Sequence, residues 1–314
     1  MPRPAEPPAP PTFAEISGMT PQELARLLNG DPASAARLLG AAARFGMVEA
    51  QVHYAQILLD GRGVARDPAA AFRWFGIAAG AGSIEGTNML GRCHELGWGV
   101  PADPEAAAVQ YRKAAEAGLD WGQYNYANLL ARGAGVAQDR DEALRWYRRA
   151  AAQGHAKSMN LVGRFKEEGW GTIADPGEAA EWYRRAAEGG DFRGQFNHAS
   201  VLARRGEIDA AATWYRRASE TGTAGFLRSM AADLLRQPYE IFHAIALEIL
   251  ARRRASGEAE DLFAYGAAIL PKDPREARRW LGRAAALGHE PAKDLLRKQG
   301  VPGRLRLIRA MLQQ

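Results

Sequence analysis

The chain has only one cysteine, Cys93, among its 314 residues. A single cysteine excludes an internal disulfide and any metal site built from several cysteines. The sequence also lacks an apolar run near the roughly 18 residues that a membrane-spanning helix needs. Residues 1–19 contain six prolines and no apolar segment of the length typical of a secretory signal. We therefore expect a disordered, proline-rich arm over residues 1–19 and a cytoplasmic protein.

The patterns of catalytic and cofactor-binding sites are missing as well. None of the six histidines lies in a metal-ligand spacing such as His-Glu-x-x-His. The Gly-x-Gly pairs do not follow a strand pattern, and there is no Gly-x-x-x-x-Gly-Lys-Ser/Thr segment, so no phosphate-binding loop is predicted. His155 and His289 each follow a helix-ending glycine and are expected to be partly exposed helix caps. We predict no catalytic residue, no metal site and no cofactor.

The overall composition is that of a folded globular chain. Hydrophobic residues make up 47% and charged residues 25% of the sequence, which is enough apolar surface to form a core. The formal charge of +5 is small for this length. It does not by itself indicate binding to nucleic acid.

Glycine is abundant, with 34 residues, and many of these glycines fall at a fixed period. Three columns of residues recur every 36 positions, which indicates an array of structural repeats. A further copy of the aromatic segment, residues 212–222, follows after 32 positions, and a last copy spans residues 278–288. The three columns are Asp31, Asp67, Asp103, Asp139 and Asp175; Leu39, Phe75, Tyr111, Tyr147 and Tyr183; and Gly46, Gly82, Gly118, Gly154 and Gly190.

Each repeat is predicted to contain two helices. The first helix begins at an Asp or Asp-Pro cap, because aspartate accepts from free backbone N–H groups and proline has none to lose there. It carries an aromatic pair followed by alanines on the same face, and it ends at the glycine of the third column. The second helix, for example residues 119–132 or 155–168, ends in a Gly-x-Gly turn. These turns are Gly61/Gly63, Gly97/Gly99, Gly133/Gly135 and Gly169/Gly171.

Small residues recur at two positions of the second helix. Small side chains let neighbouring helices approach closely, so that the rings of the adjacent helix fill the remaining space. Cys93 occupies a column otherwise filled by apolar residues, and its thiol is therefore expected to be buried and inert. The small residues are Gly86, Gly122, Ser158 and Gly194 in one column, and Gly91, Ala127, Gly163 and Ala199 in the other.

Taken together, these residues form the unit A-x-x-x-Y/L-G/A-x-x-L-x-x-G-x-G-V-x-x-D-x-x-x-A-x-x-W-Y-x-x-A-A-x-x-G, which resembles the Sel1-like repeat, a relative of the tetratricopeptide repeat. The clear copies span residues 46–222, and degenerate copies continue over 223–288. Residues 202–209 and 269–273 lack the Gly-x-Gly-Val turn, and 223–256 keep few signature positions although their length fits two helices. The resemblance implies an all-α, right-handed superhelical solenoid of antiparallel helix pairs over residues 20–300.

Members of this family mostly act as adaptors that hold other proteins together. The resemblance therefore implies a non-catalytic scaffold that binds a protein or peptide partner in its concave groove, in bacterial signalling or envelope-related regulation. Some secreted relatives carry a cysteine pair in each repeat and have been linked to penicillin-like compounds. A hydrolase-type activity like theirs is an alternative, which the single cysteine disfavours.

The candidate groove residues lie on the second helix of each repeat, at offsets 3, 6, 7 and 10 from the preceding glycine. An asparagine recurs at offset 6 or 7, and its amide can both donate and accept hydrogen bonds along a peptide. Arginines add bidentate donors for carboxylates, and a tryptophan adds an aromatic anchor. The alternative is that these polar side chains bridge neighbouring helices or are solvated. The predicted residues are Glu85, Asn88, Arg92, Trp121, Tyr124, Asn125, Asn128, Lys157, Asn160, Arg164, Arg193, Phe196 and Asn197.

Two basic features lie outside this groove. The Arg-Arg pairs at 148/149, 184/185 and 216/217 are predicted to form a solvated outer face. Nucleic-acid binding by this face is disfavoured because acidic residues are interspersed with the arginines. Residues 301–314 are predicted to form a basic capping helix that seals the last repeat. A weak contact of this helix with an anionic membrane surface is the alternative.

Overall fold

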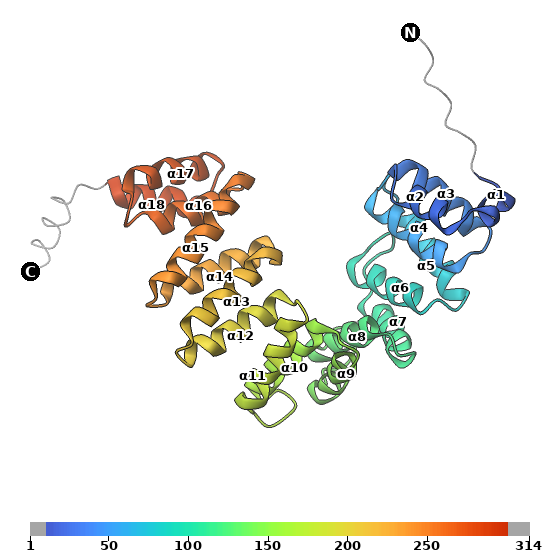
Figure 1. Cartoon of the computed structure of the whole chain (residues 1–314), viewed down its shortest axis with the longest axis horizontal. Helices are drawn as coiled ribbons and strands as arrows, with labels where there is room; N and C mark the ends of the chain where they lie inside the picture. Colours follow the sequence, from blue (N-terminus) through green and yellow to red (C-terminus); the bar gives the residue numbers. More distant parts are fainter. Residues whose placement is uncertain (1–10, 301–314) are drawn as a thin grey trace, which may run out of the picture. The chain divides into compact units, whose positions relative to one another are not determined.

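The computed structural model describes residues 11–300, and within this range all regular structure is helical (Figure 1). The chain divides into two compact units, with the boundary in the sequence between Trp182 and Tyr183. The first unit contains α1 (Phe13–Gly18), α2 (Pro21–Leu28), α3 (Pro32–Arg44), α4 (Val48–Asp60), α5 (Pro68–Gly80), α6 (Ile84–Leu96), α7 (Pro104–Glu116), α8 (Asp120–Arg132), α9 (Arg140–Ala152), α10 (Ala156–Glu168) and the start of α11 (Pro176–Glu188). The second contains the rest of α11, α12 (Phe192–Arg204), α13 (Ile208–Thr221), α14 (Ala224–Arg236), α15 (Glu240–Arg253), the short 3₁₀ helix η1 (Arg254–Ser256), α16 (Ala259–Ile269), α17 (Pro274–Ala286) and α18 (Glu290–Gly300).

The arm that the sequence predicts to be disordered over residues 1–19 is helical in its last part. Thr12 and Glu15 form a capping box at the start of α1, in which the Thr12 backbone N–H donates to the Glu15 carboxylate at 2.6 Å. Ile16 is buried against α3. Because a cap and one buried side chain stabilise this short helix, residues 13–18 correct the expectation of disorder for this part of the arm. Residues 1–10 and the predicted basic helix at 301–314 lie outside the described residues.

The first helix of each repeat begins where the sequence predicts. The side chain of Asp103 accepts a hydrogen bond from the backbone N–H of Ala106 at 2.9 Å, and Pro104 takes the first helical position. The same cap recurs at Asp67, Asp139 and Asp175. The aspartate column therefore fixes the start of successive first helices.

The Gly-x-Gly turn has a packing role as well as a conformational one. Gly133 ends α8 in the left-handed region at φ +71°, and Gly135 follows at φ +68°. A Cβ atom at Gly135 would lie 2.0 Å from the carbonyl oxygen of Pro104, at the start of the preceding first helix. The second glycine of each turn therefore packs directly on the backbone at the start of the first helix of its own repeat.

Two close contacts set the spacing between helices in the first unit. Within a repeat, a Cβ atom at Gly122 of α8 would lie 2.8 Å from the backbone carbonyl carbon of Ala114 of α7. Between repeats, a Cβ atom at Gly91 of α6 would lie 2.6 Å from the ring of Tyr111, which is fully buried. The two columns of small residues thus allow the close approach that the sequence predicts.

Cys93 is completely buried in the same core, as its column predicts. Its neighbours include the fully buried Phe75 of α5 and the partly buried Trp98. This burial raises the pKa of the Cys93 thiol to about 11. At neutral pH the thiol is therefore protonated and acts as a small apolar side chain.

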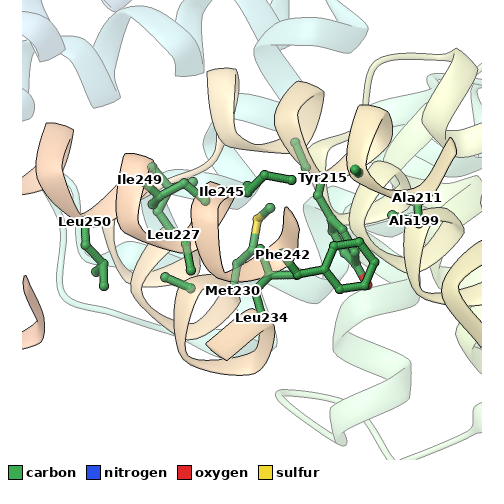
Figure 2. Close-up of a cluster of buried hydrophobic side chains, with 14 of the residues drawn as sticks. Ala199, Ala211, Tyr215, Leu227, Met230, Leu234, Phe242, Ile245, Ile249 and Leu250 are labelled. Atoms are coloured by element: carbon green, nitrogen blue, oxygen red, sulfur yellow. The ribbon is translucent and has the colours of Figure 1, made fainter. Parts of the chain in front are cut away.

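The second unit departs from the repeat pattern where its loop glycines are missing. Residues 223–256 form α14, α15 and η1, so two α-helices occupy the degenerate segment as its length predicts. Here larger apolar side chains replace the close backbone contacts, and Figure 2 shows them between α13, α14 and α15. Phe242 packs edge-on against Tyr215, with ring centroids 5.1 Å apart, and Ile245, Ile249 and Met230 are fully buried beside them.

A buried carboxylate ties the degenerate segment to the next helix. Asp261 of α16 is completely buried and accepts hydrogen bonds from Arg228 at 2.9 Å, Arg253 at 2.5 Å and Ser256 at 2.8 Å. Burial alone would raise the pKa of Asp261, but these donors lower it overall. Asp261 is therefore ionised at neutral pH, and it connects α14, α15 and η1 to α16.

Replacing Tyr147 by alanine tests the aromatic column. Tyr147 is 1% exposed, and its hydroxyl donates to Asn128 Oδ1 at 2.7 Å. We expect Tyr147→Ala to lower the free energy of unfolding by about 3–5 kcal/mol, because a cavity replaces the ring. Tyr147→Phe, which keeps the ring, should cost only about 0.5–1.5 kcal/mol. Urea denaturation followed by circular dichroism measures both, and equal effects of the two variants would contradict this role of the ring.

A pair of glycine variants separates strain from packing in the turns. At Gly118 (φ +96°) a Cβ atom would meet nothing within 4 Å, whereas at Gly135 (φ +68°) it would meet the Pro104 carbonyl. Gly118→Ala should cost about 1–2 kcal/mol of stability through its backbone conformation alone. Gly135→Ala should cost clearly more, because the turn must also move away from the start of α7. Equal losses in thermal denaturation would show that the contact between the turn and α7 does not contribute to stability.

Candidate partner-binding groove

The second helices of successive repeats line a groove in the first unit. The groove has a volume of about 620 Å³ and is lined by side chains of α4, α6, α8 and α10, with one contribution from α7. Seven of the predicted residues line it: Glu85, Asn88, Arg92, Trp121, Tyr124, Asn125 and Lys157. The offsets counted from the repeat glycines thus bring these seven side chains to one surface.

Trp121 is the most prominent apolar side chain in this groove. It is 44% exposed, although it contacts other aromatic rings. Its ring lies edge-on to Tyr124, with centroids 5.9 Å apart, and to His155, with centroids 4.6 Å apart. The Lys157 ammonium lies 4.8 Å from the centre of the indole ring, which is a cation–π distance. The indole is therefore held by its neighbours while much of its surface faces solvent.

The asparagines connect neighbouring helices. The Asn125 amide of α8 donates to Asn88 Oδ1 of α6 at 2.9 Å, and Asn128 accepts from the Tyr147 hydroxyl of α9. Asn160 of α10 is only 3% exposed and does not line the groove. These two hydrogen bonds and this burial match the alternative interpretation of the asparagine row, in which it bridges helices. Asn88 and Asn125 still contribute to the groove wall.

The charged residues of the groove differ in how they are paired. Glu95 accepts from the Tyr111 hydroxyl at 2.7 Å and pairs with Arg132 at 2.9 Å. The Arg92 guanidinium lies over the Trp98 ring, 4.9 Å from its centre. Neither Arg92 nor Lys157 forms a salt bridge with any residue between 11 and 300. Glu85 is exposed and accepts from the Ser83 hydroxyl at 3.3 Å.

The remaining predicted residues lie elsewhere. Arg164 of α10 is exposed and lies 5.5 Å from the centre of the Trp170 ring. Arg193, Phe196 and Asn197 belong to α12 in the second unit. There Arg193 lies over Phe192 at 4.5 Å, and Phe196 lines another cavity of about 550 Å³. Asn197 is partly buried.

The sequence prediction missed several lining residues that its own rule reaches. Counted from Gly46, offsets 6, 7 and 10 give Val52, His53 and Gln56, and all three line the groove. Applying the offsets to the earliest clear repeat would have found them. Met89, at offset 7 from Gly82, was missed as well although the rule reaches it. The other lining residues are Glu95, Leu96, Tyr111 and Leu119.

His155 packs against two aromatic residues of the groove, Trp121 and Tyr124. Its Nδ1 accepts from the Ser158 backbone N–H at 3.3 Å and lies 2.8 Å from the Ser158 hydroxyl, so the predicted capping role is confirmed. The ring is 7% exposed, which corrects the expectation of partial exposure: Trp121 and Tyr124 pack against it. Burial lowers the pKa of His155, an effect that Asp120 opposes and Lys157 reinforces. His289 caps α18 in the same way and is partly buried.

No group of three or more His, Cys, Asp or Glu side chains within residues 11–300 is arranged to hold a metal ion. None of the helices described here is long and apolar enough to cross a membrane.

Comparison with known protein families identifies the family of this chain. A model of the Sel1 repeat matches residues 48–83, 84–119, 122–155, 156–191 and 254–289, which together cover more than half of the sequence. The chain belongs to the Sel1 repeat family. Sel1 repeats are in general protein-interaction modules. No curated protein matches the chain.

Solved structures with similar folds include three bacterial proteins. A Sel1 repeat protein from Oxalobacter formigenes is 24% identical, with a TM-score of 0.57 over 88% of this chain and 84% of that one. A protective antigen of uropathogenic Escherichia coli is 27% identical, with a TM-score of 0.47 over 86% and 68% of the two chains. An immunity protein from Pseudomonas aeruginosa is 14% identical, with a TM-score of 0.45 over 64% and 81%. The first of these shares the Sel1 repeat fold.

The buried His155 predicts a defined dependence of stability on pH. Because its pKa in the folded protein lies below the ordinary value of 6.5, the unfolded chain takes up a proton first as the pH falls. Stability is therefore expected to decline below about pH 6.5. His155→Asn, which can still cap the helix but does not titrate, should reduce this decline. Melting temperatures measured between neutral and acidic pH test it, and parallel curves for the two proteins would contradict the assignment.

Proposed function

We propose that this protein is a non-catalytic adaptor that binds a peptide segment of a partner protein in the groove lined by α4, α6, α8 and α10. The observation that carries the proposal is the exposed indole of Trp121 inside a concave surface. Rigid aromatic side chains in such places are the usual anchors of protein interfaces. The volume of about 620 Å³ is sufficient for a few side chains of a partner.

The construction of the groove supports this function. Trp121 and Tyr124 rest on the buried His155, and the Asn125–Asn88 hydrogen bond ties α8 to α6. A wall held in this way loses little conformational freedom when a partner binds, which favours affinity. The apolar side chains of Val52 on α4 and of Met89 and Leu96 on α6 extend the surface.

The cellular setting that we propose is bacterial signalling or envelope-related regulation. This part of the proposal rests on the family, whose members hold other proteins together in such pathways. The absence of a nucleophile–base pattern in the sequence supports a binding role over the hydrolase alternative. The only cysteine is buried and protonated, so it does not supply a nucleophile.

Affinity capture with matched variants tests the proposal. Full-length protein, Trp121→Ala and Ile77→Ala are used as baits in a lysate of the source cell, with quantitative mass spectrometry. Ile77 is a suitable control because it is 49% exposed on α5 and does not line the groove. We expect a protein that is retained by the parent and by Ile77→Ala to be lost by Trp121→Ala, by at least about tenfold for an anchor worth ~2 kcal/mol. Equal retention by all three baits, with unchanged melting temperatures, would contradict the proposed groove.

A further inference from the structure

The groove presents two cations that form no ion pair with a carboxylate of residues 11–300. Arg92 of α6 and Lys157 of α10 line it from either side of α8, and neither forms a salt bridge with a described residue. The other charged lining residues are two carboxylates. Glu95 is fully engaged by Arg132 and Tyr111, whereas Glu85 lies in the first turn of α6 and is exposed. The unpaired charge along the groove is therefore predominantly positive.

Both cations rest on indole rings. Arg92 lies over Trp98 at 4.9 Å and Lys157 over Trp121 at 4.8 Å from the ring centres. At exposed sites such a contact contributes only about 0.5–1 kcal/mol, so an incoming carboxylate can compete for the cation. When Lys157 turns toward a carboxylate, it leaves the Trp121 ring free to contact an apolar side chain.

We propose that the groove binds an acidic segment in which a large apolar side chain adjoins one or more carboxylates. This inference rests on the proposed function and names the chemistry of its partner. The apolar side chain packs on Trp121, and the carboxylates pair with Lys157 and Arg92. A basic segment would instead meet two cations, and Glu85 is the one carboxylate among the lining residues that forms no described ion pair. Recognition of charge and of the apolar group is coupled, because the same lysine covers the anchor and binds the acid.

A random peptide library identifies the preferred chemistry directly. Dodecapeptides displayed on phage are selected on the full-length protein, and sequences that also bind Trp121→Ala are removed. We expect the remaining sequences to be enriched in Asp and Glu beside Leu, Ile, Phe or Trp. Enrichment of neutral or basic sequences that depend on Trp121 would overturn the acidic preference but leave the proposed function standing. If no sequence depends on Trp121, the proposed function itself is contradicted.

Calorimetric titration of one selected peptide then assigns the charges. Arg92→Gln and Lys157→Gln should each weaken binding by up to about fivefold, as expected for partly exposed ion pairs. Lys113→Gln removes the same charge from α7 outside the groove and should leave the affinity unchanged. Raising the salt to about 1 M should also weaken binding, since the screening length falls to ~3 Å. Equal affinities of the three variants and no effect of salt would overturn the inference.

Discussion

The packing of helices in the first unit depends on one kind of contact, in which an aromatic ring packs against a glycine or other small residue of a neighbouring helix. Tyr111 is the clearest case, because its buried ring fills the space in which a Cβ atom at Gly91 would stand. Gly122 makes the corresponding approach to Ala114 within a repeat. A larger residue at either glycine would push two helices apart. Since every repeat stacks on the one before, this spacing is passed along the unit.

The groove is a consequence of this spacing. The first helices carry the rings and the alanines of the core, and side chains on one face of the second helices α4, α6, α8 and α10 line the groove. The polar side chains on that face serve two purposes. Some, such as Asn88 and Asn125, hold the helices together, while Arg92, Lys157 and Trp121 face the open side. The proposed binding function thus uses groove side chains that the packing between helices does not bury.

Most of the fold follows from periodicity, because each element is marked by a residue with a clear physical role. Aspartate caps begin the first helices, and the column of Phe75, Tyr111 and Tyr147 provides their cores. The helix α1 was not predictable in this way, since Thr12 and Glu15 stabilise it outside the repeat. The degenerate segment carries no glycine pair, and its path depends on Phe242 and on the ion pairs of Asp261, which no periodic column marks.

The groove was predictable to a smaller extent. Offsets identify one face of a helix, but they do not show which side chains on that face are buried or hydrogen-bonded to a neighbouring helix. They placed Trp121 and Lys157 on the groove, yet Asn128 is used by Tyr147 and Asn160 is buried. Such pairings depend on distances across repeats, which a single sequence does not give. These pairings also determine which charged side chains in the groove can pair with a partner.

Site-specific photo-crosslinking shows whether a partner contacts the groove-lining face of the second helices. A photoreactive phenylalanine analogue is placed at Leu96 in one protein and at Val109 in another. The two positions are matched, since Leu96 is 49% exposed and lines the groove, whereas Val109 is 51% exposed on α7 outside it. If partners bind in the groove, a covalent adduct with the partner forms from position 96 and none forms from position 109. An adduct from position 109 alone would contradict binding in the groove.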